Sequence, residues 1–169
     1  MRKKTILVST LLLTIVFSSV VAAANDNFKL HGALVAEPCT FQPMDEVDFG
    51  NIVDKLLYKY QRTSGKLFQI QLKDCDTNLG KNVKVSFSGP ESPQLPGLLA
   101  VGGGIAVGLE TPAGQALALN APGLGNPLAN GDNTIALRAY IQAEPDAIAN
   151  KNIKRDVFTA SATVTLLYE

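Results

Sequence analysis

Residues 158–168 read FTASATVTLLY, a stretch in which polar and apolar side chains alternate. Successive side chains of a β-strand point to opposite faces, so an alternation of period two predicts a strand with one apolar face. The polar face carries small hydroxyl side chains at positions 159, 161, 163 and 165. The apolar face carries Phe158, Ala160, Ala162, Val164, Leu166 and Tyr168. The sequence therefore predicts that this stretch packs on an apolar core through one face only.

Shorter stretches of the same kind precede this strand. Alternating or continuous apolar patterns predict strands at 47–52, 67–72, 83–87, 105–109, 117–119 and 134–142. Residues rich in Gly, Pro and polar side chains predict turns or loops at 58–66, 78–81, 89–104, 111–114 and 120–133. We expect no more than one helical turn, at 144–149. Several short strands separated by turns favour an all-β sandwich.

The amino end has the pattern of an export signal. Arg2, Lys3 and Lys4 precede an apolar run at 6–21, and three small residues at 22–24 supply a cleavage site. The alternative, a membrane anchor, is disfavoured because sixteen residues fall short of the ~20 that a spanning helix needs. Cleavage leaves 145 residues, the size of one domain, with 12 basic and 15 acidic side chains. This balance, without a basic stripe, argues against a nucleic-acid partner.

The chain has two cysteines, Cys39 and Cys75, and both follow the leader. In an oxidising compartment two cysteines most simply form one disulfide. The alternative is a pair of free or metal-binding thiols. That alternative is disfavoured because the chain has no other cysteine and no suitably spaced histidine to complete a metal site.

Catalytic chemistry finds no support in the sequence. The glycines at 102–104 lack the Lys-Ser/Thr that a phosphate loop requires, and His31 is the single histidine of the chain. Close carboxylates, such as Asp74 and Asp76, also occur in ordinary loops. We therefore expect no catalytic residue, no cofactor, no metal site and no small-molecule substrate.

A second alternating stretch lies between the leader and Cys39. Its polar phase includes Lys29 and His31, and Gly32 stands at the centre of its apolar phase. Glycine weakens a strand by roughly 0.5–1 kcal/mol relative to alanine, so its position needs a reason. One reason is a shallow groove into which a side chain would not fit, and another is an ordinary first strand with a bulge. The residues alone leave both interpretations open.

Several motifs together resemble the subunits of chaperone–usher pili, and most closely the minor or adaptor subunits of P-type pili. They are the leader, FKLHGAL at 28–34 before Pro38 and Cys39, LKDC at 72–75 and the ending SATVTLLYE at 161–169. LPG at 95–97 and AYIQA at 139–143 add to the resemblance. The likeness spans essentially the whole chain after the leader, and the order and spacing of the motifs make it specific.

The resemblance implies a fold and a mechanism of assembly. The fold is an incomplete immunoglobulin-like sandwich that lacks its seventh strand, so an apolar groove lies open along the last strand. A periplasmic pilus chaperone fills this groove first, and the amino-terminal extension of the neighbouring pilin subunit then replaces it at an outer-membrane usher. The implied location is a fimbrium on the cell surface, reached through the periplasm.

The resemblance also assigns roles to residues of this chain. It implies a disulfide between Cys39 and Cys75, and an anchoring role for the Glu169 carboxylate in chaperone binding. The family has a glycine fourteen residues from the end, where this chain has Asp156. The implied donor-strand residues are Phe28, Leu30, Gly32, Leu34 and Ala36. The implied residues of the groove strand that pairs with the chaperone are Ala162, Val164, Leu166 and Tyr168.

The expected domains are therefore a cleaved signal peptide at 1–24, a donor-strand extension at 25–37 and a pilin domain at 38–169. The expected function is that of a structural subunit of a fimbria, in a minor or adaptor position, acting in cell adhesion. The alternative is a single-domain secreted adhesin module that binds carbohydrate. An added lectin domain is not expected, because 145 residues have no room for one.

Overall fold

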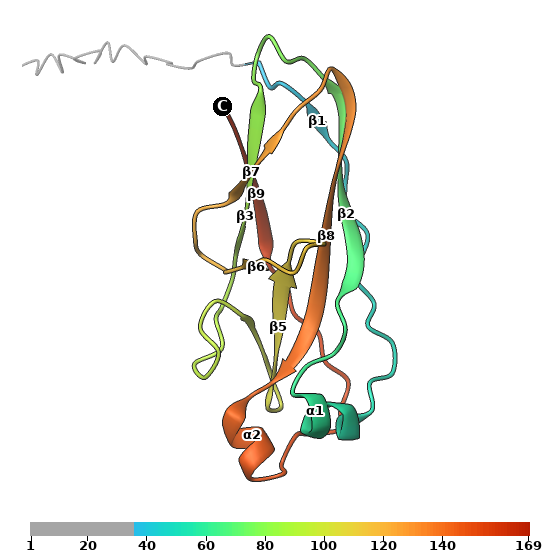
Figure 1. The fold of residues 1–169 in the computed structure, drawn as a ribbon, viewed down its shortest axis with the longest axis vertical. Helices are drawn as coiled ribbons and strands as arrows, with labels where there is room; N and C mark the ends of the chain where they lie inside the picture. The colour runs from blue at the N-terminus through green and yellow to red at the C-terminus, as the bar shows by residue number, and fades with distance from the viewer. Residues whose placement is uncertain (1–35) are drawn as a thin grey trace, which may run out of the picture. The chain divides into compact units, whose positions relative to one another are not determined.

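The computed structural model describes residues 36–169, and it shows two antiparallel β-sheets packed face to face (Figure 1). The expected signal peptide, His31 and the expected donor-strand residues other than Ala36 lie outside the described residues. The larger sheet has the order β1 (Thr40–Phe41), β2 (Lys66–Cys75), β8 (Gly131–Ala143), β5 (Ile105–Glu110) and β4 (Leu99–Gly102), with β6 (Ala116–Leu117) paired to β5. The smaller sheet has the order β7 (Leu124–Pro127), β3 (Asn82–Ser88) and β9 (Thr163–Tyr168). This is an immunoglobulin-like sandwich, as expected.

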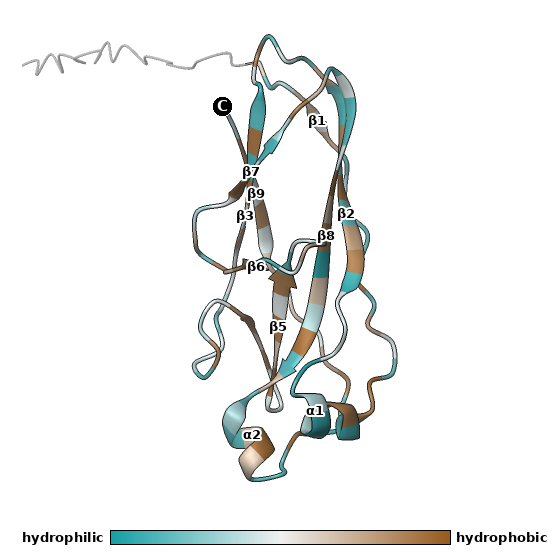
Figure 2. Cartoon of the chain, in the orientation of Figure 1, coloured by the Kyte–Doolittle hydropathy of each residue, from teal (hydrophilic) through white to brown (hydrophobic). Residues whose placement is uncertain are grey.

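The core lies between the two sheets and is built by the alternating side chains that the sequence indicated. Buried residues alternate along β3 and along parts of β2 and β8, as the strand period of two requires. Figure 2 shows apolar and polar residues interspersed along these strands. These buried side chains include Val83, Val85 and Phe87 of β3, Ile70 and Leu72 of β2, and Ile135, Leu137, Ala139 and Ile141 of β8. The strand predictions at 67–72, 83–87, 105–109 and 134–142 are confirmed.

Two short helices close one end of the sandwich, opposite the carboxyl end of the chain (Figure 1). The helical turn expected at 144–149 is confirmed as α2 (Pro145–Ala149), which begins at a proline. The helix α1 (Asp54–Tyr60) was not predicted, because its start was assigned to no element and its end to a turn. Leu57 is its buried residue, and a single buried position gives no helical period to detect.

Four assignments of strands or loops were wrong. The expected loop at 89–104 contains β4, which forms a hairpin with β5 through the three glycines at 102–104, all at positive φ. The breaker-rich stretch at 120–133 contains β7, which pairs with β3. Residues 47–52 are not a strand, and β9 begins at Thr163 rather than at Phe158.

A close approach of the chain to β3 requires a glycine at position 123. A Cβ atom placed there would overlap the backbone oxygen of Val85 and lie 2.9 Å from the backbone nitrogen of Ser86. We expect Gly123→Ala to lower the free energy of unfolding by about 1–3 kcal/mol, because backbone atoms must move to admit the methyl group. Gly125→Ala is the matched control, since a Cβ at Gly125 meets nothing within 4 Å. Equal unfolding midpoints for the two variants in urea would contradict this account.

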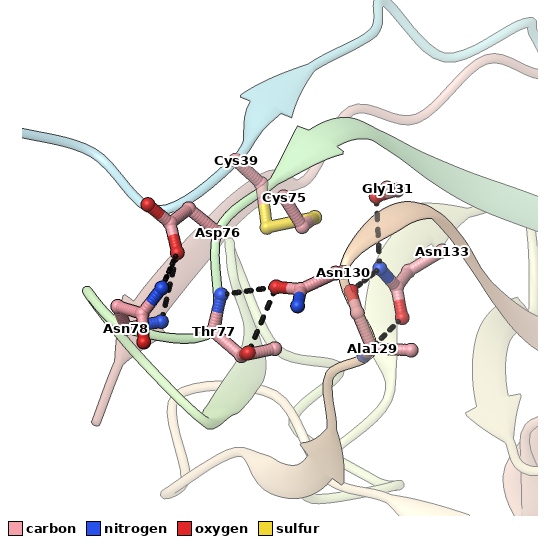
Figure 3. Close-up of a disulfide and its surroundings, with 9 residues drawn as sticks. All are labelled: Cys39, Cys75, Asp76, Thr77, Asn78, Ala129, Asn130, Gly131 and Asn133. Atoms are coloured by element: carbon pink, nitrogen blue, oxygen red, sulfur yellow. Dashed lines mark hydrogen bonds between the residues drawn. A yellow bond between two sulfur atoms is a disulfide. The ribbon is translucent and has the colours of Figure 1, made fainter.

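The disulfide fixes the start of the described chain to the end of β2 (Figure 3). Cys39 and Cys75 are bonded through their sulfur atoms and are both buried. The Asp76 amide donates to the Pro38 carbonyl at 2.7 Å, so the chain before Cys39 is held as well. The neighbouring turn is tied to the β7–β8 connection, because Asn130 Oδ1 accepts hydrogen bonds from the amide and hydroxyl of Thr77 at 2.8 Å each.

Replacing both cysteines by serine should lower the free energy of unfolding by about 4 kcal/mol. The bond closes a loop across a sequence separation of 36 residues, and a loop of that size restricts the unfolded chain by roughly that amount. Denaturant unfolding with and without dithiothreitol measures the effect. The reductant should destabilise the natural chain and leave the double variant unchanged.

Candidate functional site

An open groove of about 1170 Å³ runs between the two sheets. One wall is the segment 44–54, which leads into α1, and the other wall is the segment 153–162, which leads into β9. The floor is the core itself, formed by side chains of both sheets together with one from α1 and one from the β6–β7 connection. The floor residues are Leu57, Phe68, Phe87, Leu99, Ile105, Val107, Leu109, Leu119, Ala139 and Ile141. The groove is therefore long, apolar at its base and bounded by two extended segments.

Most of the backbone of both walls takes part in no strand pairing, although the Asp48 carbonyl accepts from Lys66 Nζ and the Lys154 amide donates to the Gly103 carbonyl. Neither residues 43–52 nor residues 155–162 make a backbone–backbone hydrogen bond with another described residue. Backbone N–H and C=O groups that leave water require partners, so these walls offer donors and acceptors to whatever enters the groove. An extended chain is the ligand whose own backbone groups have the matching spacing.

The strand β9 continues the second wall toward the carboxyl end. It pairs with β3 and with no other described strand, so its second edge is open. Of the residues assigned to the groove strand, Ala162 lines the groove, whereas Val164, Leu166 and Tyr168 are half-buried against the core. Burial raises the pKa of the Tyr168 hydroxyl, and the nearby Glu37 carboxylate raises it further. The predicted alternation is thus confirmed for β9.

Glu169 and Ala36 lie at the same end of the molecule as the disulfide. The Glu169 carboxylate accepts a hydrogen bond from Lys84 Nζ at 2.6 Å, and the Glu169 backbone pairs with Asn82. Ala36 is exposed and belongs to no strand. The anchoring role of Glu169 and the donor role of Ala36 stay predictions.

The two walls contact each other at the α1 end of the groove. Arg155 Nη2 lies 2.7 Å from Asp54 Oδ2, and the hydrogen bond from Arg155 lowers the pKa of the Asp54 carboxyl. The rings of Phe49 and Phe158 are 6.3 Å apart between centroids. Asp156, which stands where the family has a glycine, is exposed, and its carboxylate accepts from the Val157 amide. The first wall was not foreseen as part of a site, although Val47, Phe49 and Ile52 gave an apolar signal there.

The described residues form no cluster of three or more His, Cys, Asp or Glu side chains that could hold a metal ion. An ion pair that the sequence did not indicate joins the half-exposed Arg62 to the buried Glu110 carboxylate at 2.9 Å. The Arg62 guanidinium lies 3.6 Å from the centroid of the Tyr140 ring. This cluster holds the residues before β2 against β5 and β8.

Within 36–169, no helix is both long and apolar enough to span a membrane.

A family model described as "Fimbrial protein" matches residues 28–169, which include both walls, the floor and β9. The chain belongs to this family. It is 31% identical to the "Major MR/P fimbria protein" of Proteus mirabilis, over 98% of each chain. It is also 31% identical to the "Fimbrial adapter PapK" of Escherichia coli, over 66% of this chain and 67% of the relative.

The fold of this fimbrial subunit matches that of the P pilus rod subunit PapA. The TM-score is 0.69 at 22% identity, and the match covers 79% of this chain and 100% of PapA. The resemblance found in the sequence is thereby confirmed, since the chain is a pilin of the chaperone–usher class. Pilins of this class are exported and assembled with other subunits into fimbriae on the cell surface.

Proposed function

We propose that this pilin is assembled by donor-strand exchange, with residues 25–37 as the donor extension and 38–169 as the domain that receives the extension of a neighbouring subunit. The groove between 44–54 and 153–162 is the observation that carries this proposal, because it combines an apolar floor with two unpaired backbone edges. An exposed edge of this kind promotes aggregation unless a strand covers it.

The extension has about as many residues as either wall, and its pattern suits an apolar floor. Twelve residues, 25–36, reach roughly 40 Å when extended. Phe28, Leu30, Leu34 and Ala36 would face the floor, and Gly32 would lie among them. Burial of these side chains stabilises the complex at ~25 cal/mol per Å² of apolar surface, and hydrogen bonds to both walls add to it.

The same groove explains the partners that we propose. A periplasmic chaperone would occupy it before assembly, with Ala162, Val164, Leu166, Tyr168 and Glu169 beside the chaperone's strand, and an outer-membrane usher would be the place of exchange. We propose a minor or adaptor position in the pilus and a role in cell adhesion. The similarity to an adaptor supports this position.

Replacing residues 25–36 by a Gly/Ser segment of equal length tests the exchange. The variant should be captured by the chaperone as well as the natural chain is, because its groove is intact, and it should form no multimeric ladder in periplasmic extracts in mild detergent. A ladder equal to that of the natural chain would refute donor-strand assembly. If neither the variant nor the natural chain co-purifies with a periplasmic chaperone, capture by the chaperone is refuted.

A further inference from the structure

Exposed apolar side chains gather at the α1 end of the groove. The described residues include nine large apolar side chains that are exposed, and four of them lie here. Their exposed fractions are 56% for Val53, 46% for Leu56, 58% for Tyr60 and 91% for Val157. Leu56 and Tyr60 are four residues apart and so share one face of α1, and Val53 directly precedes the helix. We call these four residues the α1 patch.

The α1 patch is continuous with the groove. Val53 and Val157 both line the groove, one from each wall. The ion pair between Asp54 and Arg155 holds the two walls together at this point. An extended chain that occupies the groove as far as its α1 end therefore leaves the groove beside the α1 patch.

We call residues 25–36 of the donor extension the arm. Because few residues follow the arm before the disulfide, the body of the donor subunit must lie near the end of the groove. Only Glu37 and Pro38 separate the arm from Cys39, which is buried and bonded to Cys75. Two residues span at most ~7 Å, so the body of the donor must touch the groove end at which its arm comes out. Of the two walls only the second leads into a regular strand, β9, which is antiparallel to its partner β3, so we take the arm to extend this sheet antiparallel to β9. An arm antiparallel to β9 comes out where the segment 155–158 begins, which is the α1 end.

The charges of the two surfaces are complementary. Lys55 and Lys59 are exposed on α1, and Lys59 Nζ lies 4.9 Å from the centroid of the Tyr60 ring. The base of the arm carries the exposed carboxylates Glu37, Asp74 and Asp76 around the disulfide. Opposite charges on facing surfaces favour encounter and fix orientation.

We propose that the α1 patch is a docking surface for a second copy of this chain, which covers it with the base of its arm, the residues around Cys39 and Cys75. This contact rests on donor-strand exchange as the mode of assembly. The contact forms a second interface, between the bodies of two successive subunits, in addition to the arm in the groove. This second interface restricts the motion of one subunit relative to the next.

Two measurements separate this contact from the exchange itself. The first is binding of a synthetic peptide of residues 25–37 to the chaperone-bound subunit, which reads the groove alone. The second is the rate at which assembled full-length chains dissociate in denaturant, which reads the groove and the body contact together. The test variant is Leu56→Glu with Tyr60→Glu. The control is Leu67→Glu, because Leu67 is 55% exposed on β2 and does not line the groove.

We expect the test variant to bind the peptide within twofold of the natural chain, while its assemblies dissociate about tenfold faster or more, as when contact residues of an interface are lost. The control should match the natural chain in both measurements. Assemblies of the test variant that dissociate at the natural rate would overturn the α1 contact and leave exchange standing. Failure of the natural chain to bind the peptide would overturn the exchange on which the contact rests.

Discussion

Ala162→Trp is expected to abolish the ability of this pilin to receive a neighbour's arm. Ala162 lines the groove, is exposed there, and precedes the first residue of β9. An indole at this position would occupy the space through which an arm must pass, and the close packing of protein interiors leaves little room for both. Because the residue is exposed, the domain itself should fold normally. The subunit should therefore act as a donor only.

The measurement is assembly of a tagged Ala162→Trp subunit mixed with the natural chain. The variant should be found only at the end of each assembly where a groove is left unfilled, and assemblies should become shorter as its share rises. Thr165→Trp is the matched control, because Thr165 is exposed on the other face of β9 and does not line the groove. Incorporation of Ala162→Trp at internal positions would mean that the groove does not receive the arm at this point.

The sequence predicted the parts of the fold in which each strand has one buried face. β2, β3, β5 and β8 alternate or are continuously apolar because their side chains meet a single core. The disulfide was predicted because the chain has two cysteines and an export signal that leads to an oxidising compartment. The family was predicted from the order and spacing of several motifs. The chemistry of the core is repeated along each of these strands, and repetition is what a pattern can detect.

The errors fall where pairing, rather than side-chain burial, determines the structure. β4 and β7 contain glycine or proline and form because β5 and β3 offer them backbone partners. Conversely, 158–162 alternates as a strand should, yet no strand pairs with it in the described chain. Its pattern fits the expectation that an arm from another subunit completes the pairing, and no single-chain structure contains that partner.

Gly32→Leu is expected to have the opposite effect to Ala162→Trp, because it changes the arm and leaves the groove unchanged. Glycine in a strand marks a place where another backbone or surface approaches closely, and a bulky side chain there would hold the arm away from the floor. The hydrogen bonds to both walls would then be broken along with the apolar contacts. Chaperone capture should be unaffected, and pilus yield should fall to background. Ala33→Leu is the control, since position 33 belongs to the other face of the arm.

The two defects make a joint prediction that neither makes alone. A Gly32→Leu subunit can receive an arm but not supply one, and an Ala162→Trp subunit can supply one but not receive it. When the two variants are produced together without the natural chain, they should form pairs and nothing longer, whereas each alone should form no assembly. The formation of pairs would show that both variants fold and are defective in assembly alone, because a misfolded subunit would form neither pairs nor longer assemblies. Longer assemblies in the mixture would show that a route other than exchange between arm and groove joins these subunits.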